Sequence, residues 1–399
     1  MQSCGNTLRL IAAPLTPWPS QKSSSNAALC NFFTGSKEKA AKLSMMKPSL
    51  KARGTLKDVA RAVGVSHTTV SNAFNRPDQL SPKLRDRIVA VARAMSYPGP
   101  NPAARMLRTG FARTIAVVWA DPMPHAFEDQ AAASFLAGVA EVCVAKNLGM
   151  LLVQGGDSSS RSIQAAAIDG LIIYSMPNDS ETLQMVADRA LPTVVVDQPM
   201  IANIPFIGID DRAASRACAQ HLKDLGHERF AIVSLRLATD GYRGLVKEER
   251  LRQSIFELSQ HRVQGYLDVL SQDEHAFPVR VWECPYSIEE EGRNAAENIL
   301  STRPRPTAIL AASDRLAVGV MEVARRNRLR VPEDLSVVGF DNIPESRLVT
   351  PQLTTMSQPL KEKGRLAALV LLGGNEPLRR SLPTELIVRQ STCLVRPPN

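Results

Sequence analysis

Four polar side chains between positions 67 and 72 are of types that can make hydrogen bonds to the edges of DNA bases. They are His67, Thr68, Ser71 and Asn72. An asparagine amide can bond an adenine edge through two hydrogen bonds, and histidine and threonine can each donate or accept one. We expect the four side chains to point away from the apolar residues of a shared helix. Simple exposure to solvent is the alternative explanation of their polarity.

The charge of the surrounding segment favours binding to nucleic acid. Residues 46–113 contain thirteen Lys and Arg against three acids, whereas residues 114–399 contain thirty against thirty-five. The whole chain of 399 residues carries a net charge of +9. A short basic segment joined to a mildly acidic body is typical of nucleic-acid-binding proteins. The basic residues expected to contact phosphates are Lys57, Arg61, Arg76, Lys83 and Arg85.

Three short helices are predicted to position these side chains. Thr55 and Asp58 have the spacing of a capping box at the start of the first helix. Gly64 is expected to end that helix, because glycine suits a left-handed C-terminal position. Ser66 is a good N-cap for the second helix, and Ser81, followed by a proline, starts the third. Together they predict an all-α helix-turn-helix domain.

The segment from Thr55 to Gly110 resembles the DNA-binding end of the lactose-repressor (LacI/GalR) family of bacterial transcription regulators. The likeness runs without a gap through TLKDVARAVGVSHTTVSNAFNRPDQLSPKLRDRIVAVARAMSYPGPNPAARMLRTG. It implies a recognition helix at about residues 66–74. Many family members carry arginine where this chain has Asn72, so we expect its operator to differ at the matching base pair. The residues expected to bind DNA are Thr55, Leu56, Ser66, His67, Thr68, Thr69, Ser71, Asn72, Asn75, Arg76, Asn101, Ala104, Leu107 and Arg108.

Residues 101–113 are predicted to form a short helix and a linker. Asn101 can cap a helix, and Pro102 suits its first position. A helix this short is marginally stable when isolated, and an ordinary basic tether is the alternative. The resemblance implies the hinge helix of the family, which orders on operator DNA beside its dimer mate. A leucine, here Leu107, then wedges into the minor groove and bends the duplex.

Strands and helices alternate from Thr114 onward. The expected strands lie in TIAVVWA, GMLLVQG, DGLIIYS, PTVVVDQ, RFAIVSL, VRVWECP, TAILAAS and LSVVGFD, and a helix is expected at about residues 131–146. Short apolar strands separated by helical stretches indicate parallel sheets with crossover helices. Nearly 290 residues of this kind suit an α/β domain of two doubly wound lobes with a cleft between them. There is no G-x-G-x-x-G after the first strand and no Walker loop.

The resemblance extends over this α/β part, in HLKDLGHERFAIVS, RVQGYLDVL, AASDRLAVGVMEVARRNRLRVPEDLSVVGFDN and TPQLTTMSQPL. It implies a periplasmic-binding-protein-like domain whose chain crosses between the lobes near Gly208, Ser357 and Val388. The effector-binding residues expected from it are Trp119, Pro124, Phe127, Asp197, Arg262, Ser313, Asp341 and Leu360.

The resemblance assigns a role to the polar cleft residues, and three of them have an alternative role. Arg262 matches an arginine that bonds effector hydroxyls, with a structural salt bridge as its alternative. Asp197 and Asp341 match acids at strand ends that face the cleft. Their alternative role is that of a helix cap or a turn residue. Ser313 stands where the lactose repressor has asparagine, which leaves the identity of the ligand open. Asp314 is expected to cap its helix rather than to bind ligand.

Of the cleft residues, Trp119 and Phe127 are candidates for a stacking face in the loop WADPMPHAF, which also holds Pro124. Leu360 stands where the family often has an aromatic residue. The segment 236–260 is longer than its counterpart in the lactose repressor, and its sequence suits either a cleft lid or a surface loop and helix.

Some parts of the chain carry little signal. Residues 1–45 are expected to be a disordered extension or the product of a mis-assigned start, since Met45 and Met46 stand just before the basic segment. No long heptad run follows Leu386, so we expect no helical tetramerisation tail. The six cysteines form no C-x-x-C pair, which argues against a zinc site or a disulfide framework and fits a reducing cytosol. They are Cys4, Cys30, Cys143, Cys218, Cys284 and Cys393.

The sequence therefore predicts a cytoplasmic, DNA-binding transcription regulator. We expect residues 46–100 to bind a pseudo-palindromic operator, residues 101–113 to form the hinge, and residues 114–399 to bind a small effector and hold a homodimer. A sugar or sugar derivative is the expected effector, and repression is the expected sign. A corepressor-dependent regulator of a non-sugar pathway is the alternative. An enzyme on the same fold is disfavoured, because we find no catalytic or metal-binding motif and expect no cofactor.

Overall fold

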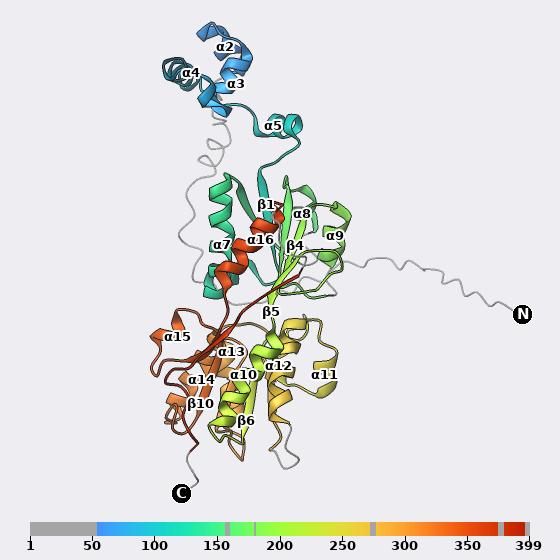
Figure 1. Cartoon of the computed structure of the whole chain (residues 1–399), viewed down its shortest axis with the longest axis vertical. Helices are drawn as coiled ribbons and strands as arrows, with labels where there is room; N and C mark the ends of the chain where they lie inside the picture. The colour runs from blue at the N-terminus through green and yellow to red at the C-terminus, as the bar shows by residue number, and fades with distance from the viewer. Residues whose placement is uncertain (1–53, 156–159, 179–180, 272–276, 374–378, 396–399) are drawn as a thin grey trace, which may run out of the picture. The chain divides into compact units, whose positions relative to one another are not determined.

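The structure is a computed structural model that describes residues 54–155, 160–178, 181–271, 277–373 and 379–395 (Figure 1). The expectation about residues 1–45 lies outside this described part. The chain divides into two compact units, residues 1–100 and residues 101–399. None of the helices in the described part is long and apolar enough to cross a membrane.

The N-terminal unit contains the three predicted helices. They are α2 (Leu56–Val63), α3 (His67–Asn75) and α4 (Pro82–Ala94), with a short 3₁₀ turn η1 (Pro77–Gln79) before α4. Val59, Val70 and Ile88 are fully buried, one on each helix, and form the centre of a small aliphatic core. Phe74 meets Tyr97 edge to face at 5.8 Å between ring centroids. The helix-turn-helix fold predicted for this segment is confirmed.

The caps that define the first two helices are present as expected. The Thr55 amide donates to Asp58 Oδ2 at 2.9 Å, and the Asp58 amide donates back to Thr55 Oγ1 at 3.3 Å. Gly64 ends α2 with φ of 75°, a left-handed conformation that glycine adopts without steric cost. The Ser66 hydroxyl then accepts from the Thr69 amide at 3.0 Å and caps α3. The tight turn that orients α3 is therefore determined locally.

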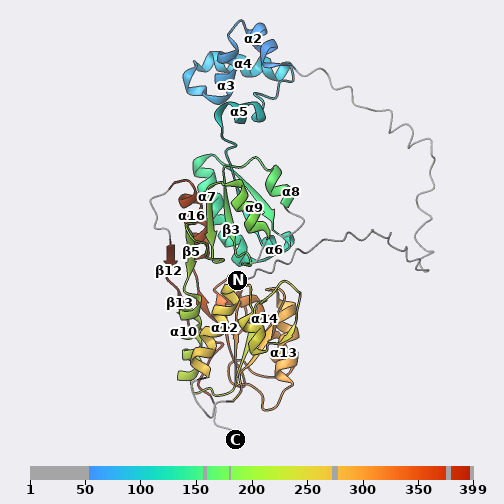
Figure 2. The same ribbon diagram turned by 90° about the vertical axis from the view of Figure 1, so that its right-hand side faces the viewer.

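The second unit begins with helix α5 (Pro102–Thr109) and continues into a two-lobed α/β fold. The first lobe holds a parallel sheet in the order β12-β5-β4-β3-β1-β2. Helices α7 and α16 cover one face of this sheet, and α8 and α9 cover the other (Figures 1 and 2). Its strands are β1 (Thr114–Trp119), β2 (Gly149–Gln154), β3 (Gly170–Tyr174), β4 (Thr193–Val196), β5 (Phe206–Ile209) and β12 (Arg379–Leu382). Its helices are α6 (Met123–Glu128), α7 (Gln130–Lys146), α8 (Ser160–Ala165), α9 (Glu181–Arg189) and α16 (Leu360–Leu371).

The second lobe holds a sheet in the order β13-β11-β10-β9-β6-β8-β7, parallel in its centre and antiparallel at both edges. Alternate residues of its central strands enter two different cores: Ile232 packs toward α10 and α12, whereas Val233 packs toward α13 and α14. Its strands are β6 (Phe230–Ser234), β7 (Gly244–Leu245), β8 (Arg280–Glu283), β9 (Ala308–Ala311), β10 (Ser336–Asp341), β11 (Thr354–Ser357) and β13 (Glu385–Ile387). Its helices are α10 (Asp211–Asp224), α11 (Glu248–Arg252), α12 (Glu257–Leu270), α13 (Glu289–Leu300), α14 (Asp314–Arg326) and α15 (Glu345–Leu348).

The chain passes between the lobes three times, as the family resemblance implies. The first passage follows Gly208, between β5 and α10, and the second follows Ser357, between β11 and α16. The third was expected near Val388, and this position is wrong. It lies between β12 and β13, because Leu386 is already paired with Met356 of the second sheet.

Helices α7 and α16 approach each other closely enough for their backbones to touch. A Cβ atom at Gly138 would lie 1.9 Å from the Lys361 carbonyl oxygen, and one at Gly364 would lie 2.0 Å from the Phe135 carbonyl oxygen. Any side chain at either position would therefore force the helices apart. This contact joins an early helix of the first lobe to one that comes about two hundred residues later.

Candidate DNA-binding surface and ligand cavity

The outer side of α3 carries polar side chains that are exposed or half-buried. His67 and Thr68 are exposed, and Ser71 and Asn72 are half-buried. Asn72 donates from Nδ2 to Gln79 Oε1 at 3.3 Å, and Asn75 donates to the Ser71 carbonyl at 3.1 Å. An adenine edge would therefore compete with Gln79 for the Asn72 amide. Gln79, which stands in the Pro-Asp-Gln turn after the helix, was not predicted from the sequence.

The other predicted residues of this unit divide into caps and exposed cations. Thr55 and Ser66 use their hydroxyls as caps, and Ser66 Oγ also lies 2.8 Å from Thr69 Oγ1. Leu56 is half-buried against the helical core, and Arg76 is the C-terminal cap residue of α3. The five basic residues expected to contact phosphates, Lys57, Arg61, Arg76, Lys83 and Arg85, are all exposed.

Helix α5 has the expected bounds and an unusually exposed leucine. Leu107 is 87% exposed, and Met106 is 37% exposed. Asn101 and Ala104 are exposed as well, whereas the side chain of Arg108 lies outside the described part of the structure. Exposed leucine gains nothing from hydrophobic burial within this chain. The side chain expected to wedge into DNA is therefore available for contact with another surface.

A cavity of about 110 Å³ lies between the two lobes, at the ends of their strands. Six of the eight expected effector residues line it: Trp119, Asp197, Arg262, Ser313, Asp341 and Leu360. Pro124 and Phe127 do not belong to the lining. The loop expected around them is the short helix α6, which buries Ala126 and leaves Phe127 69% exposed. The prediction that Phe127 supplies a stacking face is therefore wrong. Trp119, the other candidate, does line the cavity, and its ring stacks on Tyr174 at 4.7 Å between centroids.

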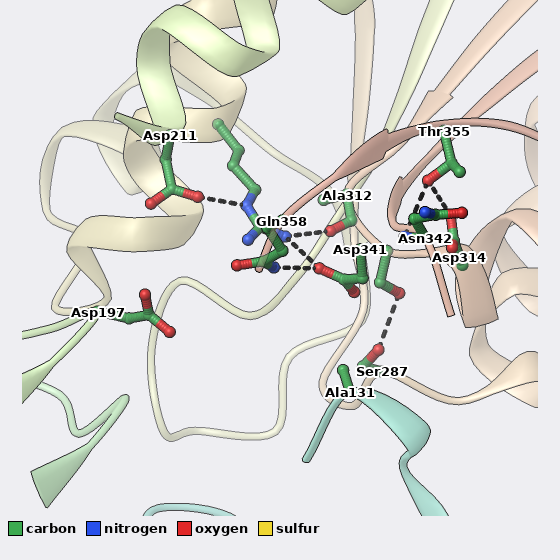
Figure 3. A network of polar contacts seen from close by, with 12 residues as sticks. Ala131, Asp197, Asp211, Ser287, Ala312, Asp314, Asp341, Asn342, Thr355 and Gln358 are labelled. Carbon is green, nitrogen blue, oxygen red and sulfur yellow. Dashed lines mark hydrogen bonds and ion pairs between the residues drawn. The ribbon is translucent and has the colours of Figure 1, made fainter. Parts of the chain in front are cut away.

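Arg262 is held by a buried polar network that includes Asp211 and Asp341, both labelled in Figure 3. It is 2% exposed, and its Nε donates to Asp211 Oδ1 at 2.8 Å. Its Nη1 donates to the Ala312 carbonyl at 2.7 Å and lies 3.6 Å from Asp341 Oδ1. The guanidinium also stacks over the Phe340 ring at 3.6 Å. The salt bridge that was the alternative role for Arg262 is therefore present, and the same residue also lines the cavity.

The network continues through Gln358 and Lys363 into the first lobe. Gln358 donates from Nε2 to Asp341 Oδ1 and accepts from the Lys363 ammonium, which also pairs with Asp197. Gln358 lies in the second passage between the lobes, so one amide bonds to groups of both lobes. Neither residue was predicted from the sequence. A signal was available, since Lys363 stands on the inner face of a helix otherwise lined by Leu360, Gly364 and Ala367.

Three cavity residues at strand ends have left-handed backbone angles. Ser175 has φ of 51°, Asp197 of 66° and Asp341 of 110°. Such conformations cost roughly 1–3 kcal/mol each outside glycine, and they concentrate at functional sites. The strain aims these side chains at the cavity from the ends of β3, β4 and β10. No local sequence pattern predicts it.

Burial raises the pKa of several carboxyl groups around the cavity. The pKa of Asp341 is raised to about 7 by burial, against the opposing effect of the Arg262 charge. The pKa of Asp129 is raised to about 6 by burial, although its side chain accepts from the Ala131 amide at 2.9 Å and caps α7. The pKa of Asp211 is also raised by burial. Asp129 and Asp211 were not predicted from the sequence, although both follow the expected pattern of an acid at a helix start.

Asp314 does not have the capping role that was expected for it. Ser313 caps α14 by accepting from the Leu316 amide, and it also accepts from the Ser287 hydroxyl at 2.8 Å. Asp314 is buried and accepts from the Ile343 amide at 2.9 Å and from the Thr355 hydroxyl. Asp314 therefore holds the loop that follows Asp341, which makes it a positioning residue for the cavity.

The segment 236–260 folds over one side of the cavity. Arg236 pairs with Asp121 of the first lobe at 2.7 Å, and its guanidinium lies 4.5 Å from the Phe256 ring centroid. The Leu258 amide donates to Gln198 Oε1 of the first lobe at 2.7 Å. Of the two roles considered for this segment, its contacts resemble those of a lid, and it also contains the short elements β7 and α11.

Comparison with known proteins agrees with this arrangement. Residues 55–101 match the family model of bacterial regulatory proteins of the lacI family, and residues 219–392 match that of the periplasmic binding protein-like domain. The HTH-type transcriptional regulator Rv3575c of Mycobacterium tuberculosis is 39% identical over 345 residues, which cover 85% of this chain and 95% of the relative. The regulator IpsA of Corynebacterium glutamicum is 38% identical over 330 residues, covering 80% and 90%.

Solved structures show the same architecture. A LacI-family regulator from Corynebacterium glutamicum has a TM-score of 0.64 at 32% identity, covering 86% of this chain and 99% of its own. The lac repressor dimer bound to operator has a TM-score of 0.68 at 24% identity, covering 85% and 99%. The chain thus shares with these transcriptional regulators a helix-turn-helix unit joined to a two-lobed binding domain. The chain belongs to the lacI family of bacterial regulatory proteins.

Proposed function

We propose that the protein is a cytoplasmic repressor that binds a pseudo-palindromic operator as a homodimer and is controlled by a small carbohydrate in its cavity. One helix-turn-helix unit contacts only a half-site, so a dimer is needed to read the whole operator. Residues 46–100 would bind the half-site, residues 101–113 would act as the hinge, and residues 114–399 would bind the effector and the second protomer.

The named functions of two relatives support this sign and this ligand class. The repressor CytR of Escherichia coli is 30% identical over 357 residues, covering 85% of this chain and 96% of its own. The regulator CelR, solved as a cellobiose complex, is 25% identical with a TM-score of 0.59 and covers 85% of this chain. We infer repression and carbohydrate binding for this chain from its similarity to these two proteins.

The observation that carries the proposal is the position of Gln358. This residue lies where the chain passes between the lobes, and it bonds both to Asp341 at the cavity and to Lys363 of the first lobe. A ligand that changes the contacts of Asp341 therefore also changes the contacts of the second passage between the lobes. By linkage, ligand and operator must then alter each other's affinity by the same factor.

The test is selection of bound genomic fragments with the full chain at near-physiological salt, because low salt strengthens non-specific binding. Recovery of a palindrome, followed by its release on adding a carbohydrate, supports the proposal. A palindrome recovered only when a small molecule is added would instead indicate a corepressor. Failure to enrich any sequence, with or without small molecules, would contradict the proposed regulator.

A further inference from the structure

One carboxylate of the first lobe binds the junction between helix α5 and strand β1. The Ala112 amide donates to Asp169 Oδ1 at 2.7 Å, and the Arg113 amide donates to Asp169 Oδ2 at 2.6 Å. The Thr114 amide also donates to Oδ2, at 3.3 Å. Bonds from an amide to a carboxylate are stronger than those between neutral groups. Three successive backbone amides are therefore held by one side chain that lies 55 to 57 residues further along the chain.

The backbone amides of the described residues change their bonding partners at Ala112. The Gly110 amide donates to the Met106 carbonyl at 2.7 Å, and the Phe111 amide donates to Thr109 Oγ1 at 3.4 Å, so both bond to the end of α5. From Ala112 onward the amides bond to the first lobe instead. The transition from helix to lobe is therefore confined to the step between Phe111 and Ala112.

Arg113 connects the same junction to two further elements. Its Nη2 donates to the Lys146 carbonyl at 3.2 Å and to the Asn147 carbonyl at 3.1 Å, at the C-terminal end of α7, where a cation is favoured by the helix dipole. Its own carbonyl accepts from the Gly149 amide, at the start of β2, at 2.8 Å. Arg113 has φ of 58°, a left-handed conformation that is uncommon outside glycine. These contacts therefore hold the backbone in a conformation that it rarely adopts on its own.

Three elements that meet at this junction also reach the cavity. Strands β1 and β3 pair in parallel from Ile115 with Gly170 to Trp119 with Tyr174, and the last two residues line the cavity. Helix α7 places Ala131 in the same lining, and its other end accepts from the arginine of the junction. A strand of 6 residues spans roughly 20 Å, and a helix of 17 residues spans roughly 25 Å. The junction and the cavity therefore lie at opposite ends of the same packed elements.

We propose that Asp169 is a positioning residue that makes the first lobe and the start of the hinge move as one body. A ligand that shifts β1, β3 or α7 at the cavity then also redirects the chain that enters α5, whereas a loose junction would absorb the shift. The inference rests on the proposed function, in which residues 101–113 act as the hinge. It adds one contact on which the coupling between cavity and operator depends.

Asp169→Asn tests this contact with little change in shape. The carboxamide replaces one acceptor oxygen by an NH₂ group, which faces a backbone N–H donor instead of accepting from it. The DNA probe is the palindromic fragment that the wild-type full chain selects, and a fragment of the same composition in scrambled order is the reference. A loosened junction must be ordered when DNA binds, so operator affinity should fall about tenfold. Affinity for the scrambled fragment should not change.

A second readout reports the coupling itself and needs no effector. Hydrogen exchange of the full chain is followed by mass spectrometry with and without saturating operator fragment. Because coupling is reciprocal, operator binding should change the exchange of wild-type peptides around Tyr174 and Gln198, at the cavity. In Asp169→Asn this change should be lost although operator is bound. A merely structural role would alter exchange at residues 112–114 and leave the change at the cavity intact.

Two further variants complete the test. Asp188→Asn is the matched control and should behave as the wild type, because Asp188 is an exposed acid of the same lobe that bonds Gln184. Asp169→Glu keeps a carboxylate and should recover part of the lost operator affinity. Thermal unfolding followed by circular dichroism checks that each variant is folded at the assay temperature.

The outcomes separate this inference from the proposed function. If the wild type selects a palindrome but Asp169→Asn binds it equally tightly, or keeps the exchange change at the cavity, the regulator stands and the positioning role is overturned. No recovery in Asp169→Glu also overturns it, since the effect would not depend on the carboxylate. If the wild type selects no fragment, the proposed function has failed and this inference fails with it.

Discussion

The polar contacts of the helical unit are local and exposed, whereas those of the cavity are distant in sequence and buried. Thr55 with Asp58, and Ser66 with Thr69, join residues three apart on the surface. Arg262 and Asp211 are 51 residues apart, and Lys363 and Asp197 are 166 apart. A local exposed contact is replaceable by water, while a buried one leaves its partner without compensation. The two regions should therefore respond to mutation on different scales.

The largest effect is expected from Arg262→Met. Removing one side of a buried ion pair typically costs about 3–5 kcal/mol, because the remaining charge is uncompensated. Here both Asp211 and Asp341 lose their cation. The measurement is urea unfolding of the full chain, with Arg216→Met as the control, since Arg216 meets Asp268 on the surface at 3.4 Å. An equal loss in the free energy of unfolding for both variants would contradict the proposed difference between buried and exposed contacts.

Leu107→Ala should weaken operator binding without changing stability. An inserted leucine compensates for unstacking of a base step, a contribution of about 2 kcal/mol, or roughly 30-fold in Kd. The side chain is 87% exposed, so folding gains little from it. Leu348→Ala provides the control, because Leu348 is a 79% exposed leucine on α15. Similar operator affinities for the two variants would contradict the wedge.

Ser66→Ala is expected to destabilise the helical unit by about 1 kcal/mol, the usual value for a lost N-cap. The hydroxyl satisfies the Thr69 amide at 3.0 Å. Ser81→Ala is a close control, since Ser81 occupies the N-cap position of α4 without making a side-chain capping bond. Thermal unfolding followed by circular dichroism measures both. A larger loss for Ser81→Ala would show that the capping geometry does not determine stability here.

Asp129 should also give the stability of the folded protein a pH dependence. Its folded pKa is raised to about 6 by burial, above the unfolded value of about 3.9. The folded state thus binds more protons between these values, and this group's contribution to stability falls as pH rises from about 4 to about 6. Asp129→Asn should lack that component. Urea unfolding at several pH values checks it, and parallel curves for the two proteins would contradict the assigned pKa.

The contrast also explains what the sequence could predict. The helix starts at Thr55 and Ser66, and the glycine stop at Gly64, depend on neighbours within four residues. They were predicted correctly, as were the eight named strand segments, whose apolar pattern is local. The family resemblance added Arg262, Asp341 and other cavity residues, which periodicity alone does not identify.

The remaining site residues depend on contacts between distant segments. Gln358 and Lys363 join the network only because the chain passes from β11 of the second lobe to α16 of the first lobe. Phe127 was misplaced because a short helix, α6, turns its ring outward. Asp314 was predicted to cap α14, but the neighbouring Ser313 is the cap. The sequence does not distinguish two capping candidates that are one residue apart.

The three passages between the lobes have a consequence for synthesis on the ribosome. The first lobe needs α16 and β12, which pack on α7 and pair with β5. The chain from Ile209 to Leu382 takes about 9 to 35 s to translate at about 5–20 residues per second. For that time the nascent first lobe has Phe135 and its neighbours on α7 uncovered. The first lobe therefore exposes apolar surface until translation is nearly complete, while the second lobe emerges from the ribosome.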